Sequence, residues 1–384
     1  MAISDELTAF VKDALARGLS RAQIEDVLLR AGWPPAQVRA TPDAERAPAK
    51  RRSLAHGGGA PCALSIWMTL RSCAPLLSGM LILVVAATAC SSKRSPAATP
   101  SSPRQELIAE IKDFQKTLGL RDTKNFSRYS EAPNAIYRCY FTGKLELPVS
   151  YVSLGLRLSE GAHCPLDEER YDVFFYPAEA VATGANPVTP ALADAPLERI
   201  LVVVPHEDFH NQAETRESSP EVAEATATLI GFLTASDFAK EKYGPSSQTF
   251  QGLDHEAQLF LQKARIVNGY YEKLSNLYST FRARRITRQN ALTRKEQLFA
   301  DLQQQCAAIT PDPVSFNKCP AAMNNAGLAF DRTYSRYYPM LFDFYRSLGQ
   351  DTKTSIQSLR RLLAAWPKSA TGAGDLISAL GSTP

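Results

Sequence analysis

The residues with the clearest chemical potential form the segment HEDFH at 206–210, which follows the apolar run 200–204. Two histidines four residues apart on a helix lie about 40° apart around its axis and about 6 Å apart along it. Both imidazoles can therefore reach one metal ion, while Glu207 is rotated away and can serve as a general base toward a zinc-bound water. We predict that His206 and His210 bind one Zn²⁺ ion and that Glu207 is catalytic.

A catalytic zinc site needs a third protein ligand. The metzincin continuation of this motif requires a glycine at 213 and a histidine at 216, where the sequence has Ala213 and Arg216. The standard alternative is a glutamate on the following helix, which gives a ligand set of two histidines and one glutamate.

The following helix is expected to begin near Ser219, because proline is favoured in a first helical turn and residue 220 is a proline. Glu224 has small neighbours that would let two helices approach closely, and we predict it as the third ligand. Glu221, one turn earlier, is the runner-up. Glu214 and Glu217 lie in the preceding turn and are expected to be solvated.

Strands are expected before this helix and helices after it. The segments YRCYF (137–141), YVSLGL (151–156) and YDVFFY (171–176) are rich in aromatic and branched residues, as strands are. Residues 254–305 show the periodicity of long amphipathic helices. The basic residues within 282–295 favour a solvated helix end over a surface that binds anionic lipid or polymer. The fold class is therefore α+β and predominantly α, with a helical C-terminal half.

The segment Glu224–Thr228, together with HEDFH and Asn324–Ala326, resembles the bacterial predicted aminopeptidases, over about residues 105–365. That family comprises HExxH zinc metallopeptidases of the gluzincin type, often lipoproteins, and the resemblance implies a zincin-like domain acting on peptides. It also implies Asn325 and Tyr334 as donors to the oxyanion of the reaction intermediate, with Tyr176 as a weaker candidate.

The sequence departs from the family pattern at several positions. Ala223 replaces the usual asparagine before the glutamate, and Asp208 stands where leucine is preferred. Pro205 precedes the first histidine, so it either begins the metal-binding helix or bends it. Aminopeptidase specificity requires acidic residues for the substrate's α-amino group, for which Glu221 and Glu179 are candidates.

An uncharged stretch from Ser72 to Cys90 has the layout of a secretory signal and ends in Ala-Thr-Ala-Cys, like a lipoprotein box. Cys90 is then the lipidated residue, the alternative being an uncleaved membrane anchor. Basic residues before this stretch predict that the following chain lies on the extracytoplasmic face of a bacterial membrane. We expect a three-helix module or a mis-called start at 1–45, linkers at 46–67 and 91–105, the signal or anchor at 68–90, the metallopeptidase domain at 106–370 and a tail at 371–384.

Four cysteines remain in the external part, and an even number in an oxidising compartment favours disulfides. Of three connectivities, the local pairs Cys139–Cys164 and Cys306–Cys319 are expected. His163 and His255 are expected at the surface or in satisfied polar positions.

The composition excludes some classes of protein. A net charge of +4 and a pI near 8.6 are too weak for a nucleic-acid-binding protein, and 45% hydrophobic residues indicate a globular chain. We therefore expect a membrane-anchored zinc metallopeptidase with peptide substrates and no nucleic-acid partner. The alternative is a non-catalytic envelope lipoprotein that retains a structural or vestigial zinc site.

Overall fold

The computed structural model describes residues 103–130, 136–159, 163–180 and 184–365, together with Arg21 and Glu25. Helices predominate, as the sequence predicts. The helices are α4 (Pro103–Thr117), α5 (Pro190–Ala193), α6 (Leu197–Phe209), α7 (Pro220–Tyr243), α8 (Gln248–Leu253), α9 (Glu256–Arg282), α10 (Arg288–Ala307), α11 (Asn325–Ser335), α12 (Tyr338–Ser347) and α13 (Thr352–Ala365). Two short 3₁₀ helices are η1 (Tyr151–Ser153) and η2 (Ala213–Glu217), and the strands are β1 (Ile136–Gly143), β2 (Gly155–Ser159) and β3 (Tyr171–Ala178).

The three strands form an antiparallel sheet in the order β2-β1-β3. Each expected strand segment is found in it, except that the first residues of YVSLGL form η1. Tyr140 lies on the face that packs against α11, where its ring is 5.6 Å from the ring of Phe330. Since side chains alternate along a strand, Tyr137 and Phe175 stack on the opposite face.

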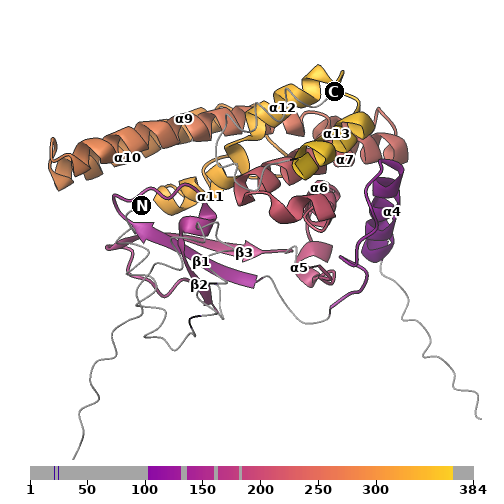
Figure 1. Cartoon of the computed structure of the whole chain (residues 1–384), viewed down its shortest axis with the longest axis horizontal. Helices are drawn as coiled ribbons and strands as arrows, with labels where there is room; N and C mark the ends of the chain where they lie inside the picture. The colour runs from indigo at the N-terminus through magenta and orange to yellow at the C-terminus, as the bar shows by residue number, and fades with distance from the viewer. Residues whose placement is uncertain are drawn as a thin grey trace, which may run out of the picture. The chain divides into compact units, whose positions relative to one another are not determined.

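Helix α11 lies between this sheet and the long antiparallel pair α9–α10, as Figure 1 shows. Asn324 caps the start of α11 by accepting a hydrogen bond from the backbone N–H of Gly327. A Cβ atom on Gly327 would lie 2.2 Å from the backbone nitrogen of Ala322, so only glycine fits there. The closely packed start of α11 therefore joins the sheet to the helical core.

Helix α7 is the centre of the helical core, and most of its residues are buried. Ser219 is its N-cap residue and Pro220 its first residue, which agrees with the expected start. Gly231 faces α6: a Cβ atom there would lie 2.9 Å from the carbonyl oxygen of Val202. Pro205 lies inside α6 and does not begin it.

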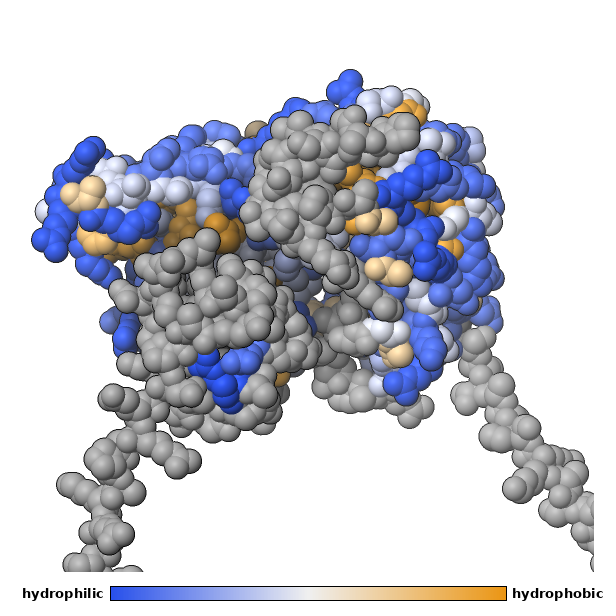
Figure 2. Space-filling model, viewed as in Figure 1, coloured by the Kyte–Doolittle hydropathy of each residue, from blue (hydrophilic) through white to orange (hydrophobic). Residues whose placement is uncertain are grey.

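The basic residues around the α9–α10 turn are exposed, as expected, with the exception of Lys295. Lys295 is buried because its ammonium group pairs with the buried carboxylate of Asp172. Hydrophilic residues cover most of the described surface on the face shown in Figure 2.

Two disulfides join Cys139 to Cys164 and Cys306 to Cys319, which is the expected local pairing. The expected linker at 91–105 is shortened at its end, because α4 begins at Pro103. The N-terminal module, the signal or anchor segment, Cys90 and the tail lie outside the described residues. No helix in the described part is both long enough and apolar enough to cross a membrane.

Candidate metal centre

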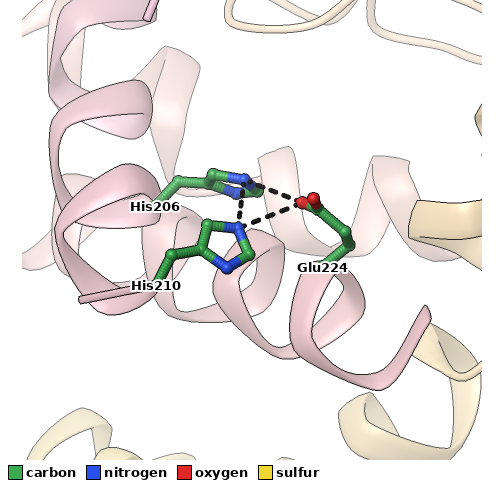
Figure 3. A group of neighbouring side chains, drawn as sticks. All are labelled: His206, His210 and Glu224. Carbon is green, nitrogen blue, oxygen red and sulfur yellow. Dashed lines mark hydrogen bonds and ion pairs between the residues drawn. The ribbon is translucent and has the colours of Figure 1, made fainter. Parts of the chain in front are cut away.

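The facing sides of α6 and α7 bring three side chains together. The Nε2 atoms of His206 and His210 are 3.2 Å apart, and each lies within 3.2 Å of Oε2 of Glu224. Figure 3 shows the two imidazoles from one helix and the carboxylate from the other pointing at one another. The close approach of the helices at Gly231 makes this convergence possible.

These separations fit a zinc ion. Zinc–ligand bonds of about 2.0–2.1 Å at tetrahedral angles place neighbouring ligand atoms about 3.3 Å apart. The three measured separations of 3.1–3.2 Å form a nearly equilateral triangle of that size. Within the described residues, this is the group of histidine, cysteine and carboxylate side chains able to hold a metal ion.

The charges at this centre are strongly coupled. Burial by itself would raise the pKa of Glu224, but His210 and His206 hold it well below its usual range. Burial by itself would lower the pKa of His210, but the Glu224 carboxylate outweighs burial and raises it. A largely buried carboxylate that faces two imidazole rings is an environment that also attracts a divalent cation.

Glu207 follows the first histidine and is partly buried. Burial raises the pKa of its carboxyl group, against the opposing influence of His206 and His210. Its carboxylate makes no hydrogen bond or ion pair with any residue in the described ranges. It is therefore free to exchange a proton with a bound molecule, as a general base must.

Tyr151 is a residue of this centre that the sequence does not predict. Its hydroxyl donates a hydrogen bond of 2.9 Å to Oε1 of Glu224, the oxygen that does not face the histidines. The backbone N–H of Tyr151 donates to Thr333 of α11, which fixes η1 against that helix. Because Tyr151 precedes Glu224 by 73 residues, no local spacing signals the contact.

Of the two expected oxyanion donors, Tyr334 lies near the centre. Its ring centroid is 6.2 Å from that of His206. Burial and the nearby Glu224 raise the pKa of its hydroxyl well above the usual value, so the hydroxyl stays protonated and can donate. Tyr176 lies beyond it, against Phe330, with its pKa raised by burial to about 12.

The assignment of Asn325 as an oxyanion donor is not supported by its position. Its side chain is fully buried, donates to the carbonyl of Lys144 and accepts from the hydroxyl of Tyr278. It lies nine residues before Tyr334 on α11, which corresponds to about 13 Å along the helix. Asn325 therefore anchors the start of α11 and does not reach the metal centre.

The other candidate glutamates are engaged elsewhere. Glu221, the alternative ligand, lies 4.0 Å from Arg336. Glu179 accepts a hydrogen bond from Nε of Arg199. Glu214 was expected to be solvated, but it is largely buried between Arg121 and Arg360. His163 and His255 are exposed, as expected.

Asp208, which stands where the family pattern prefers leucine, fixes the end of α6. Its buried carboxylate accepts a hydrogen bond from Thr123 and lies 3.6 Å from the ammonium group of Lys112 on α4. Asn125 donates to the backbone carbonyl of Glu207 from the same loop. These contacts hold the helix at the point where the two histidines project.

A family model described as "Putative aminopeptidase" matches residues 159–371, which is more than half of the 384-residue chain. The chain belongs to this family. The match contains α6, α7 and α11, and therefore every residue of the candidate centre except Tyr151. No curated protein and no solved structure matches the chain.

Proposed function

We propose that this member of the aminopeptidase family is a membrane-anchored, zinc-dependent metallopeptidase. The observation that carries the proposal is the triangle of donor atoms from His206, His210 and Glu224, next to the carboxylate of Glu207, which has no partner in the described ranges. Zinc, when bound there, would supply Lewis-acid chemistry that acidifies a water molecule and polarises a substrate carbonyl.

The protein's own groups account for the remaining requirements of peptide hydrolysis. Glu207 accepts a proton from water and then passes it to the leaving amine. The Tyr334 hydroxyl is the candidate donor to the developing oxyanion. Tyr151 holds the Glu224 carboxylate in place through Oε1.

A structural zinc site is less consistent with this geometry. Structural sites bind zinc with four protein ligands, whereas catalytic sites use three and keep one position open. The group in the described part of the chain offers three ligand residues. A structural zinc site would also leave unexplained the partly buried carboxylate of Glu207, which has no partner among the described residues.

The test compares hydrolysis of a fluorogenic aminoacyl and peptide panel by the wild type and by Glu207→Gln. We expect about a 10²–10⁴-fold loss of turnover with zinc content unchanged, because the substitution removes the base and keeps the ligands. Glu241→Gln, at an exposed position near the end of α7, is the matched control and should retain activity. Equal turnover in wild type and Glu207→Gln contradicts the mechanism, and absence of turnover in both favours the non-catalytic lipoprotein.

The anchor is a separate part of the proposal. The apolar segment ending at Cys90 supports export and lipidation, and the two disulfides agree with an oxidising compartment. Cys90→Ser should abolish incorporation of labelled fatty acid in a bacterial host. Unchanged incorporation in this variant would exclude Cys90 as the lipidated residue.

A further inference from the structure

Arg138 lies on the sheet face that packs against α11 and has no carboxylate partner among the described residues. It lies on β1 opposite Tyr176 of β3, and it shares its face with Tyr140 two residues later. The side chain is half-buried, and its Nη1 atom lies 3.4 Å from the Tyr140 hydroxyl. Throughout the described ranges no carboxylate forms an ion pair with it.

The position of Arg138 connects it to the metal centre through adjoining tyrosines. The ring of Tyr140 is 6.1 Å from the ring of Tyr151, whose hydroxyl binds Glu224. These contacts therefore link Arg138, through Tyr140 and Tyr151, to the carboxylate of Glu224.

The carboxylates near the centre have partners or proposed roles, whereas Arg138 has no carboxylate partner among the described residues. Glu224 is turned toward the histidines, Glu207 is the proposed base, and Glu179 is bound by Arg199. None of these carboxylates pairs with Arg138 in the described part of the chain. A carboxylate would find Arg138.

The edge strand β2 shows that this face is open beside Arg138. Leu158 lies directly opposite Arg138 and is 72% exposed, and Leu156 lies opposite Tyr140 and is 50% exposed. Directly opposed residues in an antiparallel pair share a face. Two exposed leucines next to a half-buried arginine form a surface that suits an apolar side chain adjacent to a carboxylate.

We propose that Arg138 binds a carboxylate of the peptide substrate, a few residues from the cleaved bond, with Leu158 contacting a neighbouring apolar side chain. The planar guanidinium presents paired N–H donors that match a carboxylate, whether it is the C-terminus or an acidic side chain. This inference rests on the proposed peptidase function and gives it a substrate class: short peptides recognised by their negative charge.

The test is binding of peptides to the full-length Glu207→Gln protein, measured by calorimetry, because this variant should bind peptide without cleaving it. The probes are acetyl-tetraalanyl-leucine with a free C-terminus, its C-terminal amide, and an amide in which one internal alanine is replaced by glutamate. We expect the free acid to bind about 10- to 100-fold more tightly than the plain amide. Tight binding of the glutamate peptide instead would identify a side chain as the source of the carboxylate.

Adding Arg138→Gln should remove this preference, and Arg138→Lys should keep part of it, since the charge remains without the paired donors. Arg157→Gln is the matched control, because Arg157 is exposed on the opposite face of β2. A thermal unfolding curve for each variant separates loss of binding from loss of folding. Equal binding of all three peptides, or equal losses in the Arg138 and Arg157 variants, overturns the inference. If the wild type cleaves peptides but the Glu207→Gln protein shows no such binding preference, only this inference fails. A binding preference without cleavage by the wild type counts against the peptidase function alone.

Discussion

The hydrogen bond from Tyr151 to Glu224 predicts that Tyr151→Phe weakens zinc binding. The substitution removes one hydroxyl, which donates to Oε1 at 2.9 Å, and leaves the aromatic ring in place. The ring contacts with Phe330 and Tyr334, at 5.9 and 6.4 Å between centroids, should persist. The effect should therefore appear in metal affinity and not in folding.

The expected loss of zinc affinity in Tyr151→Phe follows from the role of this hydrogen bond. Loss of a hydrogen bond that orients a metal ligand typically lowers metal affinity 10- to 100-fold. That range corresponds to about 1.4–2.7 kcal/mol, which matches the usual strength of a hydrogen bond to a charged group. Glu224 is largely buried, so water should replace the lost donor poorly.

The assay is competition for zinc against a chromophoric chelator of known affinity. Tyr140→Phe is the matched control, since the Tyr140 hydroxyl contacts Arg138 and not Glu224. We expect the control to bind zinc like the wild type. Affinity of Tyr151→Phe within twofold of the wild type, or an equal loss in Tyr140→Phe, would refute the assigned role of Tyr151.

Three further predictions concern stability. Gly327→Ala should lower the free energy of unfolding by about 1–3 kcal/mol in urea titrations, because the new methyl group would overlap the backbone of Ala322; a change below about 0.5 kcal/mol would contradict this close packing. Asp208→Ala should lower it by about 3 kcal/mol by leaving Lys112 without its buried carboxylate partner, and a Tm equal to the wild type would count against that pair. Removing metal with a chelator should lower Tm by about 5–10 °C if zinc is present at about 100 times its Kd, with the same shift in Glu207→Gln; no shift would mean that nothing stabilising was bound.

The elements that the sequence predicts well are those with local signals. The spacing of His206 and His210 is a property of one helix, and the start of α7 follows from Pro220 with Ser219 before it. The small residues of α7 correctly indicate close helix packing, although a close approach to α6 also occurs at Gly231, which has no local signal in the sequence.

The features of the site that could not be predicted from the sequence depend on contacts between distant segments. Tyr151 reaches Glu224 from a segment read as a strand, and only the folded arrangement of η1 against α11 creates the contact. The role of Asn325 as an oxyanion donor is implied by the resemblance alone, and its burial beside Tyr278 depends on packing between α9 and α11. Glu214 appeared solvated because the arginine from α13 that covers it is 146 residues away.

The zinc content of the purified full-length protein after exhaustive dialysis tests the central claim most directly. The account predicts one zinc ion per chain in the wild type and in Glu221→Ala, and almost none in Glu224→Ala. The two glutamates are one turn apart on α7, so the pair of variants separates the ligand from its neighbour. Zinc retained by Glu224→Ala, or lost from Glu221→Ala alone, would contradict the proposed centre.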